Sequence, residues 1–200
     1  MKAFLAVDTS TAMVSAALFV DGNLRAAAAR EVPPRSSGSL LELVPPLLDQ
    51  AGLTFADLED GFAFGRGPGS YAGLRTCVAT IRGWALPFQH PIWAIPSALA
   101  VAAAYFDAHP EAARCTLAGR ARRDTCWTAA FSRRPGTPAF VPVQEGSFAL
   151  CPATPSPVAD SLHATPSAEW IGRLRLAGLD SDAPLPIYLH PAVSTAPRYA

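Results

Sequence analysis

The chain has 200 residues, half of them apolar, which is enough for one sizeable core or two small lobes but not for a string of independent domains. Sixteen basic and sixteen acidic side chains cancel. The sequence therefore lacks the overall charge that attracts a polyanion such as tRNA or an anionic membrane, and any contact with nucleic acid has to be local or indirect.

The cysteines and the N-terminal stretch indicate the cellular compartment in which we expect the protein. The four cysteines have no CxxC spacing, so they indicate neither a zinc site nor a disulfide framework, and we expect reduced buried thiols at Cys77, Cys115, Cys126 and Cys151. Residues 1–20 resemble a secretory signal in composition, but Asp8 and the polar run up to Thr11 interrupt the apolar stretch. No segment approaches the roughly 20 apolar residues of a membrane span, so we expect a cytoplasmic protein without membrane contact.

The first elements in chain order are three strands. Residues 3–7 and 14–20 form continuous apolar runs, as expected of buried strands. Asp21-Gly22 is a strong hairpin signal, because both positions tolerate positive φ, and it predicts that a third strand at 24–29 is antiparallel to the second.

Helices and further strands alternate after this hairpin. Apolar residues at helical spacing predict an amphipathic helix from Ser39 to about Gly52, in which Pro45 and Pro46 predict a kink or two short pieces. The remaining expected elements of this half are a strand at 61–65, a helix at 70–86, a strand at 91–95 and a helix at 98–108.

This order predicts a mixed sheet covered by helices, in the ribonuclease-H-like arrangement, over residues 1–108. Residues 109–200 carry shorter runs and predict a smaller second lobe, with strands near 116–118, 125–131, 140–143 and 187–189 and a helix near 167–177. Prolines crowd 135–157 and 184–197, so we expect irregular structure there and a mobile end to the chain.

A polar turn follows the first strand and offers a carboxylate and three hydroxyls, at Asp8, Thr9, Ser10 and Thr11. Such a turn can present backbone N–H groups to a phosphate and Asp8 to a Mg²⁺ ion or a water. Alternatively, these side chains only satisfy the backbone of the turn itself. Both interpretations stay open on the residues alone.

A glycine loop follows the fourth strand and leads into a helix, where free N–H groups favour anions. Its spacing is neither GxGxxG nor GxxxxGK followed by Ser or Thr. We therefore predict a structural turn with Ser70 as the helix N-cap, made by Gly65, Gly67, Gly69 and Ser70.

Histidines and arginines give weaker signals. None of His90, His109, His163 and His190 belongs to an HxxxH or HExxH pair, so the residues predict no metal and no cofactor. Five arginines bracket an expected hairpin in the second lobe and indicate a solvated surface, or alternatively a weak contact with an RNA backbone: Arg120, Arg122, Arg123, Arg133 and Arg134.

Several strings of the sequence together resemble the TsaB family: LAVDTSTAMVSAAL, SLLELVPPLLDQAGL, GRGPGSYAGLRTCVATIRGWAL and IPSALAVAA, in this order and spacing within residues 3–106. GRARRDTCWTAAF and PLPIYLHP extend the resemblance more thinly. It implies an actin-like/sugar-kinase fold of two lobes, and a scaffold role beside TsaD, the catalytic paralogue that transfers a threonylcarbamoyl group to tRNA.

The resemblance also implies that this chain lacks the transferase site. TsaD binds its metal partly through an HxxxH pair, and the aligned positions here are Ser97 and Val101, neither of which replaces an imidazole ligand. A non-catalytic subunit without cofactor is therefore expected.

Partner binding is implied through the two helices of the first lobe, with candidate interface residues Leu40, Leu43, Val44, Leu47, Tyr71, Gly73, Leu74, Cys77 and Thr80. The implied partner is a TsaD-type paralogue, with a TsaE-type ATPase in a larger complex, a homodimer when the paralogue is absent, and only indirect contact with tRNA. Two departures from the family pattern, Ser36-Ser37 and Pro45-Pro46, affect this surface.

Two other functions compete with the scaffold. The first is an ATP-dependent phosphotransferase or hydrolase of the same superfamily that uses the Asp8 turn. The second is a free-standing RNA-binding module that uses the arginine hairpin, against which the neutral net charge argues.

Overall fold

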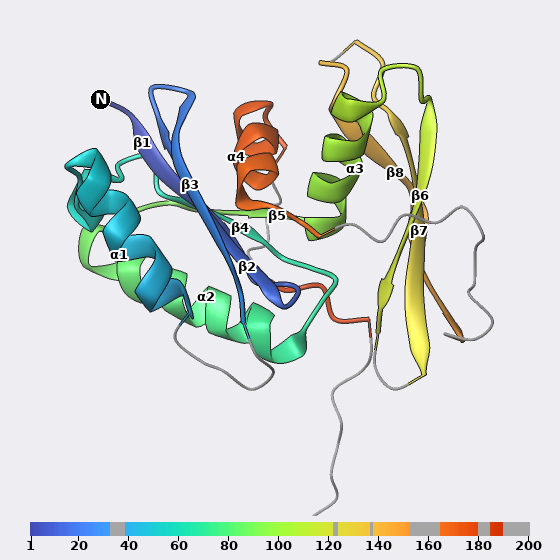
Figure 1. Ribbon diagram of the computed structural model, residues 1–200, viewed down its shortest axis with the longest axis horizontal. Coiled ribbons are helices and arrows are strands. Elements are labelled where there is room, and N and C mark those ends of the chain that lie inside the picture. Colours follow the sequence, from blue (N-terminus) through green and yellow to red (C-terminus); the bar gives the residue numbers. More distant parts are fainter. Residues whose placement is uncertain (33–38, 122–123, 137, 153–164, 180–184, 190–200) are drawn as a thin grey trace, which may run out of the picture.

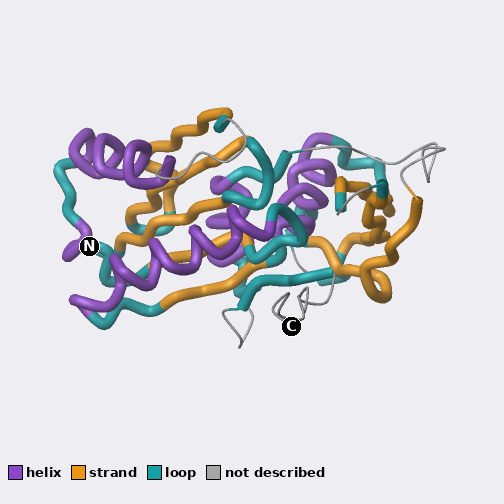
Figure 2. The backbone as a smooth tube through the Cα atoms, turned by 90° about the horizontal axis from the view of Figure 1, so that it is seen from below, coloured by secondary structure: helices purple, strands orange, loops and turns teal. Residues whose placement is uncertain are grey.

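The computed structural model describes residues 1–32, 39–121, 124–136, 138–152, 165–179 and 185–189. Two β-sheets lie at opposite ends of an elongated molecule, and helices cover and separate them (Figures 1 and 2). The predictions for Ser36-Ser37, Arg122, Arg123, His163, His190 and the end of the chain fall outside the described residues.

The larger sheet has five strands in the order β3-β2-β1-β4-β5. These strands are β1 (Ala3–Asp8), β2 (Met13–Val20), β3 (Asn23–Glu31), β4 (Phe62–Gly65) and β5 (Ile92–Ile95). Strand β2 is antiparallel to both of its neighbours, β1 and β3, whereas β4 is parallel to β1 and β5 is parallel to β4. This is the ribonuclease-H-like sheet that the sequence predicts, so the fold class is confirmed.

The hairpin between β2 and β3 has the expected turn. Asp21 and Gly22 both take positive φ, at 48° and 79°. Two consecutive positive values match the twist of the flanking strands, which explains why an Asp-Gly pair occupies this position.

Both faces of the five-stranded sheet are covered. Helices α1 (Ser39–Ala51) and α2 (Tyr71–Ala85) pack on one face, on odd-numbered β1 residues such as Leu5. Helices α3 (Ser97–Ala108) and α4 (Ala168–Leu176) pack on the other face, on even-numbered residues such as Phe4. The alternation explains the unbroken burial of β1, because every side chain meets a helix layer.

Helix α1 corrects one prediction. It runs through Pro45 and Pro46 as a single α-helix, not as two pieces. A proline removes the N–H that would bond the carbonyl four residues earlier, which here belongs to Leu41 and Glu42. Both of these residues are exposed, so water can satisfy their carbonyls and the helix tolerates the prolines.

The smaller sheet contains β6 (Arg114–Arg120), β7 (Thr125–Arg133) and β8 (Pro142–Pro152), paired in that order and antiparallel throughout. Strand β8 corrects the expectation of irregular structure across 135–157. Its two prolines are its first and last residues and it is an edge strand, so neither has to donate within the sheet.

Helix α3 lies between the two sheets (Figure 1). Ala100 and Ala103 pack toward the five-stranded sheet, while Val101 and Phe106 pack on residues of the three-stranded sheet. Helix α4 follows the second sheet in the chain yet packs on β1, β2 and β4 of the first. The lobe boundary at residue 108 stays a prediction. Helix α4 comes after this boundary in the chain but packs on the first sheet.

The strand expected at 187–189 does not form. The described residues 185–189 contain no strand, and the backbone of Ile187 makes one hydrogen bond, from its N–H to the carbonyl of Arg66 at 2.7 Å. This bond, the packing of Leu189 on the core beside α3 and the ring contact between Tyr188 and Tyr71 hold the segment without extending a sheet.

Candidate functional site

Three parallel strands end at the same edge of the large sheet and bring the sequence-predicted polar turn to the glycine loop. Asp8 is the last residue of β1, Gly65 is the last of β4, and Ser97 begins α3 two residues after β5. Since the carboxyl ends of parallel neighbours meet at one edge, residues separated by almost 90 positions in the chain become neighbours here.

Asp8 is completely buried, and its carboxylate is held by hydroxyl and amide donors. Oδ1 accepts hydrogen bonds from the backbone N–H of Ser10 at 2.8 Å and from its hydroxyl at 2.7 Å. Oδ2 accepts a bond from the hydroxyl of Ser97 at 2.6 Å. The oxygen of Ser97 in turn accepts the N–H of Gly67 at 3.0 Å, so a chain of bonds joins β1, α3 and the loop.

Burial and hydrogen bonding act on Asp8 in opposite directions. Burial disfavours the charged carboxylate and raises the pKa of Asp8 above its ordinary value. The donors from Ser97 and Ser10 favour the ionised form and counteract part of this shift. Burial is the larger effect, so the carboxyl is easier to protonate than an exposed aspartate.

The loop glycines make this close approach possible. A Cβ atom on Gly65 would lie 1.7 Å from Oδ2 of Asp8, and one on Gly69 would lie 2.2 Å from the carbonyl oxygen of Ser10. Gly67 has a φ of 95°, which side chains disfavour. Gly65 and Gly69 are therefore required for contact with the Asp8 turn, and Gly67 is required for the backbone conformation of the loop.

The same contacts continue into α2. Ser70 is the N-cap of this helix, and its hydroxyl accepts the N–H of Gly73 at 3.2 Å. The N–H of Ser70 donates to the carbonyl of Ser10 at 2.7 Å, and the hydroxyl of Thr9 donates to the carbonyl of Gly73 at 2.9 Å. Thr11, by contrast, is exposed and bonds only the backbone of Met13 among the interactions described.

The structure therefore joins Asp8, Thr9 and Ser10 with the glycine loop and leaves Thr11 outside. Within the described residues, no group of three or more histidine, cysteine or acidic side chains has the arrangement of a metal site. The hydrogen bonds of this arrangement connect the end of β1 and the loop after β4 to the first residues of α2 and α3.

Sequence reasoning missed the contact between Asp8 and Ser97. The signal was available in principle, because two polar residues at the ends of parallel strands share one sheet edge. The sequence does not give the strand order. In the structure only β4 separates β1 from β5, and this order brings Asp8 close to Ser97.

The candidate interface residues divide by burial, and this corrects part of the list. The side chains of five of them lie in the core and cannot meet a partner without rearrangement: Leu40, Val44, Leu47, Leu74 and Cys77. Leu43, Gly73 and Thr80 are half-buried. Tyr71 is 53% exposed, and its ring lies 5.0 Å from that of Tyr188.

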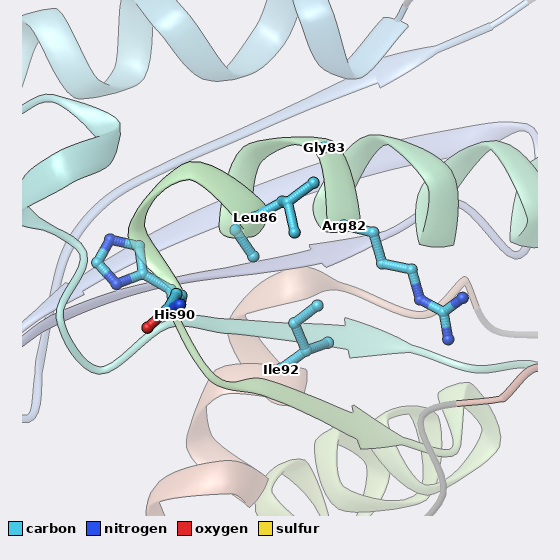
Figure 3. Close-up of a pocket in the computed structure, with 7 residues that line it drawn as sticks. Arg82, Gly83, Leu86, His90 and Ile92 are labelled. Carbon is cyan, nitrogen blue, oxygen red and sulfur yellow. The ribbon is translucent and has the colours of Figure 1, made fainter.

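Helical spacing explains this division. The apolar positions of an amphipathic helix mark the face that packs on the sheet, and the sequence pattern does not distinguish this face from a partner face. On α1 and just after α2, sequence reasoning missed three large exposed apolar residues, which are Leu41, Leu86 and Phe88, at 58%, 78% and 45% exposure. A shallow, mainly apolar groove between the end of α2 and β5 is lined by Arg82, Leu86, His90 and Ile92, among others (Figure 3).

The arginines of the second lobe have different surroundings. Arg120 is exposed on β6. Arg133 donates to the backbone carbonyls of Phe106, His109 and Ala112 at 2.9, 2.7 and 2.7 Å, so it holds the end of α3. Arg133 is thus a structural cation, which corrects its assignment to a solvated or RNA-contacting surface.

Comparisons with known proteins identify the family. The family model described as "TsaD: tRNA N6-adenosine threonylcarbamoyltransferase" matches residues 31–134, more than half of the chain. A "tRNA threonylcarbamoyladenosine biosynthesis protein TsaB" of Escherichia coli K12 is 33% identical over 99 residues, which are 49% of this chain and 42% of the relative. The chain belongs to the TsaB family.

Further members agree. The protein of the same description from Haemophilus influenzae Rd is 34% identical over 108 residues, 52% of this chain and 44% of the relative. YeaZ from Pseudomonas aeruginosa has a TM-score of 0.75 at 26% identity, with 94% of this chain and all of that chain covered. A second solved structure, described as similar to peptidase YeaZ from the same organism, has a TM-score of 0.75 at 28% identity, over 95% of this chain and all of that one.

Both curated relatives are described as biosynthesis proteins for tRNA threonylcarbamoyladenosine. The matched region spans less than half the length of the two curated TsaB relatives. Among the described residues, no helix is both long and apolar enough to cross a bilayer.

Proposed function

We propose that this chain is a non-catalytic subunit in the formation of threonylcarbamoyladenosine on tRNA, and that it binds and activates a TsaD-type paralogue. The observation that carries the proposal is the hydrogen bond between Ser97 and Asp8. Ser97 is the position that the family resemblance aligns with the first metal-binding histidine of the transferase.

The surroundings of this bond support a structural role. Ser97 is fully buried and Val101, at the second aligned position, is 5% exposed within the apolar core. Both Asp8 oxygens already accept hydrogen bonds from the protein. A metal or phosphate at Asp8 would have to displace these donors, so the geometry favours a scaffold over the alternative of an ATP-dependent phosphotransferase or hydrolase.

The surface proposed for the partner is the outer side of α1 and α2. The two helices lie on the same face of the sheet, α1 over β2 and β3 and α2 over β4 and β5. Leu41 and Tyr71 project from them into solvent. Exposed aromatic and leucine side chains on packed helices are suitable anchors, because their apolar area leaves water on binding without disturbing the core.

Other parts of the proposal follow from the family. The complex acts in the cytoplasm, tRNA is contacted through the paralogue, a TsaE-type ATPase joins the larger complex, and the same helices support a homodimer when the paralogue is absent. The neutral net charge agrees with an indirect role toward tRNA.

The first test is co-expression with the TsaD-type paralogue of the same genome, followed by size-exclusion chromatography and an assay of threonylcarbamoyladenosine formation. We expect co-elution, and modification that depends on this chain. Separate elution with undiminished modification would refute the proposed function.

The partner surface is tested by Tyr71→Ala and Leu41→Ala. Loss of an interface anchor of roughly 2 kcal/mol weakens binding about 30-fold, while the fold keeps its core. Leu150→Ala is the matched control, because Leu150 is 43% exposed on the second sheet. Equal affinity of all three variants would place the partner elsewhere.

A further inference from the structure

Two cysteines on neighbouring strands of the second sheet lie in direct contact. Cys126 of β7 and Cys151 of β8 are partners in the antiparallel register. Their sulfur atoms are 3.4 Å apart, and each sulfur also contacts the carbonyl oxygen of the other residue, at 3.8 and 3.5 Å. Both thiols are free.

The backbone already has the spacing of a disulfide. Paired residues in antiparallel strands have Cα atoms about 4.5 or 5.5 Å apart, depending on the type of pair, and disulfides are found at Cα separations of about 4.4 to 6.8 Å. Both kinds of pair satisfy this condition. Bond formation therefore requires side-chain rotation and a small approach of the sulfurs, without a change of register.

The pair is on the face of the sheet that points away from α3. The neighbouring β7 residues Trp127, Ala129 and Phe131 belong to the core beside α3, and side chains alternate along a strand. Cys126 is 6% exposed, whereas Cys151 is half-buried. A small reagent therefore meets Cys151 first, with Cys126 immediately behind it.

The two other cysteines have a different environment. Cys77 and Cys115 lie in the apolar cores, where burial raises their pKa to about 12 and about 11. Few thiolates form there at neutral pH, and the thiolate is the reactive species. Burial also raises the pKa of Cys126, so selectivity for the pair rests on the direct contact of its two sulfur atoms and on the accessibility of Cys151.

We propose that Cys126 and Cys151 form a reversible redox pair, which small-molecule disulfides such as oxidised glutathione convert to an intramolecular disulfide. The Cys151 thiolate attacks one sulfur of the reagent and releases one glutathione thiolate, which gives a mixed disulfide. The Cys126 thiolate then attacks Sγ of Cys151 and releases the second. The two protein protons pass to the two released thiolates, so two protein thiols are oxidised as one disulfide is reduced.

The bond would fasten the outer part of the sheet. The β7–β8 pairing is interrupted between Thr128 and Ala130, and only four pairs follow this irregularity up to Pro152. A crosslink between residues 25 positions apart removes conformational freedom from the unfolded chain. The disulfide would keep the last residue pairs of the β7–β8 ladder together.

The experiment uses the full chain, reduced and then exposed to oxidised glutathione under native conditions, with intact mass, peptide mapping and thermal unfolding as readouts. We expect loss of the mass of two hydrogen atoms, a linked peptide that contains Cys126 and Cys151, a rise of roughly 5 °C in Tm, and reversal by dithiothreitol. A persistent glutathione adduct, a crosslinked dimer or an unchanged mass would each overturn the proposal.

Two variants separate the roles of the thiols. Cys126→Ser is expected to retain one glutathione on Cys151, because the resolving thiol is missing, and Cys151→Ser is expected to stay unmodified. Modification of Cys77 or Cys115 in either variant contradicts the proposed selectivity. The wild-type mass decides the question even if a variant fails to fold, and it does not depend on the proposed scaffold function.

Discussion

Replacing Ser97 by alanine is the most direct perturbation of the Asp8 site. The variant removes the donor to Oδ2 of Asp8 at 2.6 Å and the acceptor of the Gly67 N–H at 3.0 Å. Both partners stay in the interior, since Asp8 is completely buried and Gly67 is buried as well. The site thus loses two bonds and gains none.

The magnitude follows from the type of each bond. A hydrogen bond to a charged group contributes about 1.5 to 3 kcal/mol and a neutral one about 1 kcal/mol. We therefore expect the free energy of unfolding to fall by roughly 3 kcal/mol. For a chain of this size each kcal/mol shifts Tm by about 2 to 4 °C, so Tm should fall by about 6 to 12 °C.

The pH dependence gives a sharper expectation. The folded-state pKa of Asp8 is raised, so stability is greatest below the unfolded pKa and decreases as pH rises through the folded pKa. The bond from Ser97 lowers this pKa, and its loss raises the pKa further. The stability difference between wild type and Ser97→Ala should therefore be larger at about pH 8 than at about pH 4.

The assay is thermal unfolding monitored by circular dichroism at both pH values. Ser147→Ala, at an exposed position of β8, is the matched control and should leave Tm within about 1 °C. An unchanged Tm for Ser97→Ala, or a difference that does not grow with pH, would refute the reasoning that this hydroxyl supports a buried aspartate.

Two further predictions concern packing around the same elements. In α2, Gly73→Ala should lower the free energy of unfolding by about 2 kcal/mol or more, because its Cβ would lie 2.3 Å from the carbonyl oxygen of Thr9, whereas Gly83→Ala in the same helix meets open space and should raise it by roughly 0.5 to 1 kcal/mol. Equal effects in urea unfolding would contradict this contrast. Arg133→Lys should lower Tm by about 4 to 8 °C, because lysine keeps the charge but not the fork that bonds several carbonyls at the end of α3, while Arg120→Lys on the surface should change little. A similar Tm for both lysine variants would show that Arg133 does not hold the helix.

The sequence predicted most of the large sheet because its signals are local. Apolar runs, the Asp21-Gly22 turn and helical periodicity each act within a few residues, and they appear in the structure close to the expected bounds. The prediction of a broken α1 failed because it considered Pro45 and Pro46 without the exposure of the carbonyls that they leave unpaired. That exposure depends on which face of the helix meets the sheet.

The site was less accessible to sequence reasoning because its contacts are long-range. Asp8 was a candidate for its residue type, but its bond to Ser97 depends on strand order and on the space that Gly65 leaves. The contact between Cys126 and Cys151 depends in the same way on the register of β7 and β8, which their sequence spacing does not reveal. Residue type suggested what these groups can do, and tertiary structure decided which partners they have.

The position of α3 has a consequence for how the molecule unfolds. Its alanine-rich surface is buried on both sides, and Leu99 packs against both neighbouring cores. Pulling the two sheets apart would expose one side of this helix to water and break the only helix layer they share among the described residues. We therefore expect the two sheets to unfold in one cooperative transition.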